Sequence, residues 1–426
     1  MERRTGTQWT AFFQSPEGKR KLAELYGSRE GEAERQAQRY ARLLEEHAKL
    51  FGGCEEICLV SAPGRIEIGG NHTDHNRGCV LAAAINLDTV AAVTPTADGV
   101  ITVHSDGYRP ILVETDDLAL RPREEGTTAA LIRGVAARMR ALGYRVGGLQ
   151  AVVTSSVLPG SGLSSSAAFE VLVVAMLDAL YNGWSVPGLL RAQIAQYAEN
   201  VFFGKPCGLM DQTASSVGGL VQIDFAGEQA QVRGLQYDFA AKGYAVCVVN
   251  TGGSHGDLTA DYAAIRSEME KVAAHYGKKA LRETQEEWVE ADLALLRTET
   301  GDRALLRALH FFAENRRVQA QVDALERDDL PAFFAEVNAS GDSSWMLLQN
   351  VWARPSEQPV ALALALSKRI LGGQGACRVH GGGFAGTILA FVPNALLGEY
   401  ARRMEALSGT GACAVLDIRP EGAVSV

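Results

Sequence analysis

Apolar residues recur at helical spacing near the start of the chain. One set comprises Leu22, Leu25 and Tyr26, and a second comprises Tyr40, Leu43, Leu44, His47 and Leu50. Charged residues fill the positions between them, and Gly52-Gly53 ends the pattern. Residues 15–50 therefore predict one or two amphipathic helices.

Strand-like and helix-like segments alternate along the rest of the chain. Short apolar or β-branched runs predict strands at 57–62, 79–95, 147–154, 219–225, 244–250, 376–380, 385–393 and 412–418, with a hairpin at 98–116. Longer apolar or charged segments predict helices at 127–143, from the serine-rich loop to Tyr181, and at 186–203, 257–275, 281–327, 359–370 and 394–407. This alternation in both halves favours an α/β or α+β class, with a domain seam near residues 225–245.

Composition narrows the classes of function. The chain has 426 residues, which suggests two or three domains, and 47% hydrophobic with 21% charged residues is typical of a globular protein. Its net charge of −9 argues against a nucleic-acid partner, because phosphate backbones require a basic face. A local site can still hold an anionic ligand.

The cysteines and the N-terminus suggest a compartment. Seven cysteines, an odd number at irregular spacing, do not form a disulfide framework and are predicted to be reduced thiols. The first residues lack the apolar core of a signal peptide, and no uninterrupted apolar run reaches the roughly 18 residues of a membrane span. We therefore expect a cytoplasmic protein with no membrane partner. The sequence does not indicate whether it is a monomer or a homodimer.

Residues 61–81, SAPGRIEIGGNHTDHNRGCVL, are the most informative stretch. Their glycines and turn formers surround Arg65, His72, Asp74 and Asn76. So many polar groups argue against a buried strand, whereas glycines let backbone approach a ligand closely. We expect a site for a small polyhydroxylated molecule. No further His or Cys completes a metal site, so His72 is expected to bond substrate and His75 to be structural.

A glycine- and serine-rich loop, residues 160–166, follows a predicted strand and precedes an apolar helix. Its backbone N–H groups and the positive end of the helix suit a phosphate, and its serines could bind Mg²⁺. It is not a Walker A loop, because no Gly-Lys-Ser/Thr follows. The alternative interpretation is a serine-rich helix cap.

Two further segments carry candidate chemistry. Asp211 lies in a glycine-marked apolar segment and is a candidate general base, although it could instead cap a helix that starts near Gln212. Glu199 could bind a metal or be solvated. The glycines of residues 380–386 permit close packing of backbone on a ligand, or form only a structural turn.

In this order the motifs resemble the GHMP kinase superfamily and, within it, the galactokinase family. The family's G-R-x-N-L-I-G-E-H-T-D-Y-N-x-G motif is matched at Gly64, Arg65, Gly70, His72, Thr73, Asp74, Asn76 and Gly78. Its phosphate loop is matched at Gly160–Ala167, its C-G-I-M-D-Q at Cys207–Gln212, and its G-G-G-F-G-G at Gly381–Gly386 with Ala385 as the exception. The matches span about residues 57–392.

The resemblance implies an α+β, two-domain GHMP kinase fold. Its N-terminal domain would be like domain 2 of ribosomal protein S5, and its C-terminal domain ferredoxin-like. We expect these domains at residues 53–230 and 231–426, with residues 1–52 as a helical extension outside the family pattern.

The resemblance also implies an ATP-dependent sugar-1-kinase with Mg²⁺ as cofactor and residue roles to match. Asp211 would take the proton of the anomeric hydroxyl, with Arg65 beside it. Ser166 and Glu199 would hold Mg²⁺. The phosphates would lie on Gly160, Ser161, Gly162, Leu163, Ser164, Ser165 and Ser166, and the sugar on Asn71, His72, Asp74, Gly208 and Tyr262.

Departures from the family motif affect the expected substrate. Glu67 replaces the family's Asn, Asn71 its Glu, and His75 its Tyr. That Glu bonds a sugar hydroxyl far from the reacting carbon, and Asn keeps a hydrogen bond but loses the charge. We therefore expect galactose as substrate, with galacturonate or arabinose as the alternative. A non-catalytic sensor of sugar and ATP is a third hypothesis, which an intact Asp211 and Arg65 disfavour.

Overall fold

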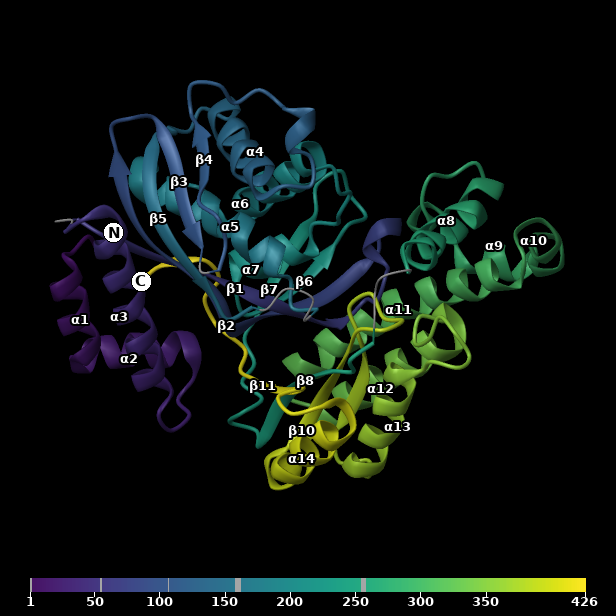
Figure 1. Cartoon of the computed structure of the whole chain (residues 1–426). Coiled ribbons are helices and arrows are strands. Elements are labelled where there is room, and N and C mark those ends of the chain that lie inside the picture. Colours follow the sequence, from purple (N-terminus) through teal and green to yellow (C-terminus); the bar gives the residue numbers. More distant parts are fainter. Residues whose placement is uncertain (1, 54–55, 106, 158–161, 254–257) are drawn as a thin grey trace. The chain divides into compact units, whose positions relative to one another are not determined.

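The structure is a computed structural model that describes residues 2–53, 56–105, 107–157, 162–253 and 258–426 (Figure 1). Its residues form two compact units. Unit 1 comprises Met1–Arg65, Ala84–Gly219 and Ile418–Val426, and unit 2 comprises Ile66–Ala83 and Leu220–Asp417. Strands β1 (Cys58–Gly69) and β2 (Cys79–Thr96) contribute residues to both units.

Unit 1 is built on one mixed sheet, with strand order β12-β1-β2-β5-β3-β4. The further strands are β3 (Val100–Ser105), β4 (Ile111–Glu114), β5 (Gly148–Ser155) and β12 (Val424–Ser425). β3 runs parallel to β5, whereas β3 and β4 form an antiparallel hairpin with Val100 opposite Glu114. The hairpin predicted at residues 98–116 is thus confirmed.

The unit 1 sheet has helices on both faces (Figure 1). Ala91 and Val93 of β2 pack into a core with α4 (Thr128–Ala141), α5 (Ser165–Leu177) and α6 (Gly188–Tyr197). Val90 and Ala92 point the other way and pack on α1 (Gly6–Gln14), α2 (Pro16–Tyr26) and α3 (Glu32–Phe51). This alternation follows from the two-residue period of a strand and explains why residues 90–93 of β2 are all apolar.

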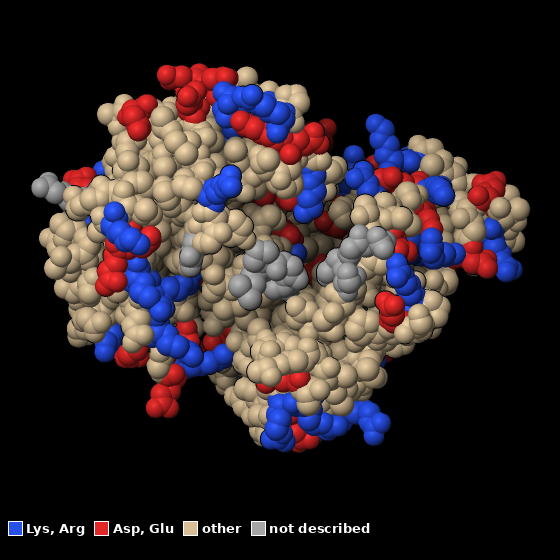
Figure 2. All heavy atoms as spheres, in the orientation of Figure 1, with Lys and Arg blue, Asp and Glu red and all other residues tan. Residues whose placement is uncertain are grey.

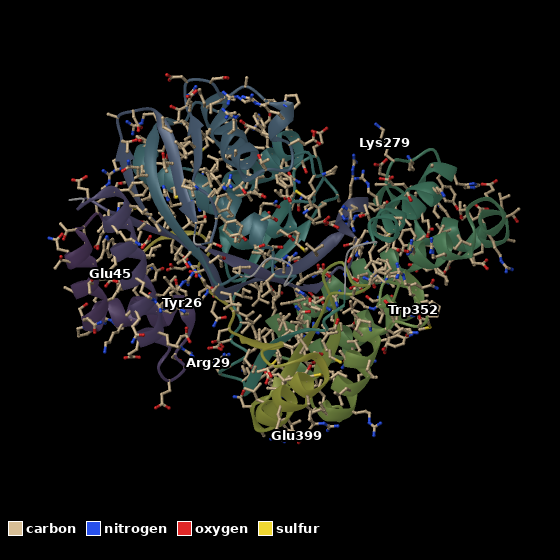
Figure 3. All side chains as sticks on the ribbon, viewed as in Figure 1. Tyr26, Arg29, Glu45, Lys279, Trp352 and Glu399 are labelled. Carbon is tan, nitrogen blue, oxygen red and sulfur yellow. The ribbon has the colours of Figure 1, made fainter. Side chains whose placement is uncertain are left out.

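A buried carboxylate, Asp88 of β2, fastens the N-terminal helices to the sheet. It accepts hydrogen bonds from Arg39 Nη1 at 2.6 Å, Tyr26 Oη at 2.6 Å and Arg419 Nη1 at 3.0 Å. Figure 3 marks Tyr26 at the end of α2. Burial alone would raise the pKa of Asp88, but the charges of Arg39 and Arg419 lower it below the ordinary value. The helical extension is therefore an integral part of unit 1.

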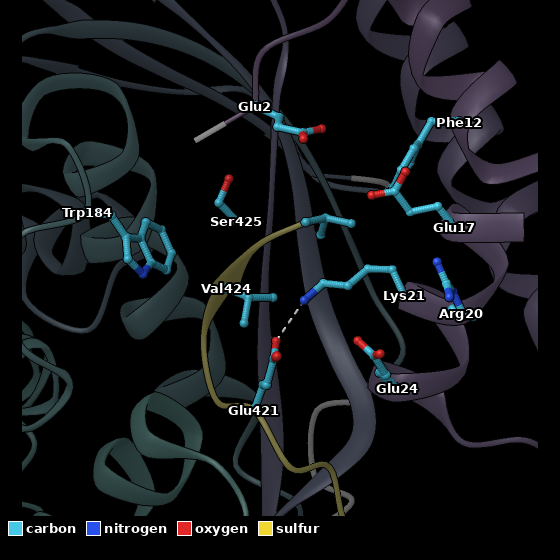
Figure 4. Close-up of a pocket in the computed structure, with 11 residues that line it drawn as sticks. Glu2, Phe12, Glu17, Arg20, Lys21, Glu24, Trp184, Glu421, Val424 and Ser425 are labelled. Carbon is cyan, nitrogen blue, oxygen red and sulfur yellow. Dashed lines mark hydrogen bonds and ion pairs between the residues drawn. The ribbon is translucent and has the colours of Figure 1, made fainter. Parts of the chain in front are cut away.

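A cavity of about 650 Å³ lies in unit 1 beside this extension (Figure 4). Residues of α1, α2 and the C-terminal segment line it, together with Trp184. Lys21 Nζ is 2.9 Å from a Glu421 carboxylate oxygen across this lining.

Helix α5 is the most apolar helix of unit 1. With the π-helical turn η3 (Asp178–Asn182) it forms a segment, Ser165–Asn182, that is long and apolar enough to cross a membrane by length and composition. Since 72% of that segment is buried inside the structure, it has the character of a core helix.

Unit 2 is built on a four-stranded antiparallel sheet, with order β11-β8-β10-β9. Its strands are β8 (Tyr244–Asn250), β9 (Ala376–His380), β10 (Thr387–Pro393) and β11 (Cys413–Leu416). Helices α13 (Pro359–Leu371) and α14 (Leu397–Ser408) share a core with this sheet. A separate hairpin of β6 (Leu220–Asp224) and β7 (Gln231–Leu235) pairs with the first residues of β2.

The remaining helices of unit 2 are α8 (Thr259–His275), α9 (Glu286–Ala291), α10 (Leu293–Thr300), α11 (Asp302–Glu326) and α12 (Leu330–Ser343). α8 and α11 share a core that includes Phe384. The stretch 281–327, predicted to be helical, is divided by Gly301, whose φ of 88° ends α10. Acidic and basic side chains are interspersed on the face of the molecule in Figure 2.

One expectation about the fold is wrong. Beyond the strand predicted at 57–62, the polar groups of the following residues argue against a buried strand, yet β1 continues to Gly69 and is buried throughout, including Arg65 and Glu67. Helices α1 and α12 and strands β7 and β12 were not predicted. The other predicted elements are confirmed within a few residues.

Candidate active site

Arg65 joins the end of the unit 1 part of β1 to the loop that precedes α5. Its backbone N–H donates to Leu163 O at 3.1 Å, and its Nη1 donates to Gly162 O at 2.7 Å. A Cβ on Gly64 would lie 2.8 Å from Leu163 O, so only glycine allows this approach. Gly64 is therefore required by the close approach of the loop that precedes α5.

Arg65 also forms an ion pair with Asp211, which lies in the first turn of α7 (Met210–Val217). Arg65 Nε is 2.7 Å from Oδ1 and Nη2 is 2.8 Å from Oδ2, a bidentate pair. The Ser164 hydroxyl donates to Oδ2 as well. Burial raises the pKa of Asp211, but Arg65 and Ser164 outweigh it and lower the pKa below 3.8. Asp211 is therefore an ionised acceptor, and Leu209 rather than Asp211 occupies the cap position of α7.

Ser164 begins α5 in an unusual conformation. It has a φ of 60° and occupies the N-cap position, but its side chain makes no cap hydrogen bond because the hydroxyl serves Asp211. A helix N-terminus without a side-chain cap can offer its first N–H groups to an anion. Of the predicted phosphate loop, Gly162, Leu163, Ser165 and Ser166 lie beside it, and Gly160 and Ser161 fall outside the described residues.

Two buried carboxylates lie near this site. Glu170 of α5 and Glu199 of the π-helical turn η4 (Ala198–Phe203) accept hydrogen bonds from the same Gln212 Nε2, at 3.2 and 2.9 Å. Burial raises the pKa of Glu170 well above 4.5, and the charge of Glu199 adds to this. Glu170 Oε1 is buried and has no hydrogen-bond partner in the part of the chain that the structure describes, and Lys205 Nζ lies 3.2 Å from Glu199 Oε1. A cation bound between these two carboxyl groups would favour their charged forms, which burial otherwise disfavours.

This donor chemistry fits Mg²⁺, which prefers oxygen ligands and shares its shell with phosphates and water. Among the described residues, no group of three or more His, Cys, Asp or Glu could hold a metal alone. Ser166 lies exposed in the first turn of α5, and Glu199 is buried. Gly208 lies in the segment between η4 and α7, shortly before Asp211.

Unit 2 gathers three of the predicted sugar-binding residues on one glycine loop. Asn71 Nδ2 donates to Gly381 O at 2.8 Å, and His72 Nε2 is 3.0 Å from Gly382 O. Tyr262 Oη of α8 donates to Gly383 O at 3.1 Å. Three successive carbonyls are therefore bound by three side chains, two of them adjacent in the sequence and the third from α8.

The glycines of this loop are required by close packing. A Cβ on Gly382 would lie 2.6 Å from the Tyr262 ring, and one on Gly383 would lie 2.2 Å from Asn350 O. Gly383 also has a φ of 81°, which a side chain would strain. The loop is thus a scaffold for Tyr262 and the neighbouring side chains.

His72 is set up as a neutral hydrogen-bonding group. Burial, followed by the nearby His75, lowers its pKa to about 4. A neutral imidazole that donates from Nε2 to Gly382 O has Nδ1 left as an acceptor, which suits a sugar hydroxyl. Asp74 lies at the start of the 3₁₀ turn η1 (Asp74–Asn76), with one carboxylate oxygen 3.7 Å from His75 Nε2.

Sequence reasoning missed the buried residues that support residues 70–79. Glu314 Oε1 of α11 accepts the N–H groups of Gly70 and Asn71 at 3.1 and 3.4 Å, and His310 Nε2 lies 3.0 Å from Asn71 O. His310 and Glu314 are one helical turn apart and both fully buried. Their spacing within an apolar stretch was the available signal, but 281–327 was interpreted only as a charged helical region.

Comparison with known proteins agrees with these motifs. Residues 45–95 match the galactokinase galactose-binding signature, and residues 130–219 match the GHMP kinases N terminal domain. The chain is 33% identical to a galactokinase of Streptomyces coelicolor over 368 residues, covering 85% of this chain and 91% of that protein. It is 34% identical to a galactokinase of Haemophilus influenzae over 346 residues, covering 79% and 85%.

Solved structures with the same fold include a Lactococcus lactis galactokinase complexed with galactose. That match has a TM-score of 0.78 at 23% identity and covers 91% of this chain and 99% of the other. A Methanococcus jannaschii mevalonate kinase matches with a TM-score of 0.60 at 12% identity, covering 84% and 98%. The α+β GHMP kinase fold expected from the motifs is confirmed.

Proposed function

Because this chain belongs to the galactokinase family of the GHMP kinases, we propose that it transfers the γ-phosphoryl group of ATP to the anomeric hydroxyl of galactose. The observation that carries the proposal is the bidentate ion pair of Arg65 with Asp211, to which the Ser164 hydroxyl adds a hydrogen bond. This arrangement places an ionised acceptor next to a fixed cation and beside the N-terminus of α5.

In the proposed step, the anomeric oxygen forms a bond to the γ-phosphorus while the bond from the γ-phosphorus to the β,γ-bridging oxygen breaks. The hydroxyl proton passes to Asp211, and the products are galactose 1-phosphate and ADP. Since Arg65 keeps the pKa of Asp211 low, the carboxylate orients the hydroxyl and takes the proton only as the new bond forms. Arg65 also stabilises negative charge on the transferring group.

We assign the nucleotide phosphates to the loop from Gly160 to Ser166 and Mg²⁺ to Ser166 and Glu199. When bound, Mg²⁺ would neutralise phosphate charge. The uncapped start of α5 and the buried carboxylates Glu170 and Glu199 support this assignment. His72, Asp74, Gly208 and Tyr262 are assigned to sugar hydroxyls, for which His72 Nδ1 is a suitable acceptor.

The remaining assignments are part of the same proposal. We place the GHMP kinase domains at residues 53–230 and 231–426, with residues 1–52 as an extension. We expect the enzyme in the cytoplasm with ATP and a small sugar as its partners.

A second candidate substrate is galacturonate or arabinose. Position 71 carries a neutral amide where the family motif has a carboxylate, so repulsion of a substrate carboxylate is removed there. The two family galactokinases that match most of the chain favour galactose as the first choice.

A coupled ADP-release assay on purified enzyme with ATP, Mg²⁺ and each of galactose, galacturonate and arabinose tests the proposal. Turnover on galactose with the highest kcat/KM is the expected result. Turnover with only one of the other sugars would identify that sugar, rather than galactose, as the substrate. Sugar binding by calorimetry without turnover on any of them would overturn the kinase assignment and leave a sensor.

A further inference from the structure

Glu67 and Asn71 face each other in unit 2, where Asn71 Nδ2 donates to Glu67 Oε1 at 2.9 Å. The family motif has the amide at the first position and the carboxylate at the second, so this chain carries the two groups in reverse order. We propose that Glu67 and Asn71 form one exchanged acid–amide pair, in which Asn71 is a positioning residue for the glycine loop rather than a sugar ligand. The link to sugar affinity rests on the proposed function.

The first argument is that Asn71 has no hydrogen-bonding capacity left for a ligand. Its two amide protons go to Glu67 and to Gly381 O. Its Oδ1 accepts from Asn350 Nδ2 at 2.8 Å and from Ser344 Oγ at 3.2 Å. A side-chain amide offers two donors and two acceptor lone pairs, and all four are used. The residue is also fully buried, at 0% exposure.

The second argument is that the carboxylate at position 67 has its own cation. Arg378 of β9 is fully buried and its Nη2 donates to Glu67 Oε1 at 2.8 Å. Its Nε and Nη1 have no hydrogen-bond partner among the described residues, and its direct ion pair is with Glu67. Removing one partner of a buried ion pair strongly destabilises the folded protein, because the other charge stays buried without compensation.

The third argument is that the pair fixes the backbone next to His72. Asn71 and His72 bind the adjacent carbonyls of Gly381 and Gly382. A carboxylate at position 71 would have no proton to donate to Gly381 O or to Glu67. The amide at 71 and the acid at 67 are therefore each required by the presence of the other.

Isosteric variants test this coupling without changing side-chain size. Asn71→Asp places two carboxylates in contact and is expected to raise the KM for galactose at least tenfold while the KM for ATP changes less than twofold. Adding Glu67→Gln supplies an amide proton for Asp at position 71. The double variant is therefore expected to have a KM for galactose at least fivefold lower than that of Asn71→Asp and a higher urea midpoint. Glu67→Gln alone is expected to raise the KM and lower the urea midpoint relative to the wild type.

A matched control uses Asn76, a second buried asparagine nearby that bonds Met269 and Leu281 rather than Glu67. Asn76→Asp should not be rescued by Glu67→Gln. If the two substitutions at 67 and 71 instead have additive effects on both the KM and the urea midpoint, the two side chains are not energetically coupled and the proposal is overturned. The urea midpoints do not depend on any sugar, so a coupled midpoint without turnover would count against the proposed function alone.

Discussion

Arg65 and Asp211 are joined by two parallel hydrogen bonds of 2.7 and 2.8 Å, although they are 146 residues apart in the sequence. The pair fixes the direction of the Asp211 oxygens and keeps the carboxylate charged. Arg65 also connects β1, the loop before α5 and the first turn of α7, because its other donors bond the backbone of that loop.

Asp211→Asn is expected to reduce kcat by about 10³-fold, because the amide cannot take a proton although it fills the same space. The galactose dissociation constant, measured by calorimetry, should change less than threefold. Asp302→Asn is a matched control, since Asp302 forms an exposed pair with Arg297 at 2.6 Å and should leave kcat unchanged. Substantial turnover by Asp211→Asn would show that another group takes the proton.

Arg65→Lys is expected to move the acid limb of the kcat/KM profile to higher pH. The charge and hydrogen bonds of Arg65 lower the pKa of Asp211, and a lysine ammonium cannot reproduce the bidentate geometry. The pKa of Asp211 should therefore rise toward 3.8 or above, so that activity falls at a higher pH than in the wild type. The measurement is kcat/KM for galactose between pH 3 and pH 8, so that the acid limb of both proteins falls within the range. An unchanged acid limb would show that the ionisation of Asp211 does not determine the pH dependence of kcat/KM.

The sequence motifs named Arg65 and Asp211 as candidate catalytic residues, and the structure joins them in an ion pair, but the motifs did not predict the strand that carries Arg65. Arg65 and Glu67 lie in a buried strand, a place that local pattern analysis excludes for charged residues. They are stable there because Asp211 and Arg378 neutralise them, and both partners come from remote segments. Pairing at such distances has no local signature, so the sequence pattern does not predict that the strand continues through residues 63–69.

Asn71 shows the same limit for recognition. The family resemblance implies a sugar ligand at this position, whereas the positioning role proposed above rests on contacts with Ser344, Asn350 and Gly381, which no spacing in the sequence links to Asn71. By contrast, the apolar and β-branched run of β2 and the helical spacing of α2 and α3 predicted these elements well, because residue type and local spacing determine their burial.

Asp88→Asn is expected to destabilise the protein by about 3–5 kcal/mol, because it leaves two buried guanidinium groups without their carboxylate. Arg419 is 1% exposed and Asp88 is 0% exposed, so water cannot replace the lost charge. Urea unfolding followed by circular dichroism measures the change. Asp302→Asn again serves as the control and should barely move the midpoint, because its pair with Arg297 is exposed. A small effect at Asp88 would mean that the N-terminal helices are held mainly by apolar packing.

His72 gives a prediction for the pH dependence of stability. Its pKa is about 4 in the folded protein and near the ordinary value of 6.5 when unfolded. Between these values the unfolded chain binds a proton that the folded chain does not, so stability is present above pH 6.5 and is lost as the pH falls toward 4. His72→Gln removes this contribution.

The test compares urea unfolding of the wild type and His72→Gln at intervals from pH 7.5 to pH 4. Other buried histidines, such as His310, also have lowered pKa values, so the informative quantity is the difference between the two proteins. That difference should shrink steadily as the pH falls below 6.5, because only the wild type loses the contribution of His72. A difference that stays constant with pH would mean that His72 is protonated alike in both states, and the neutral acceptor assigned to Nδ1 would be abandoned.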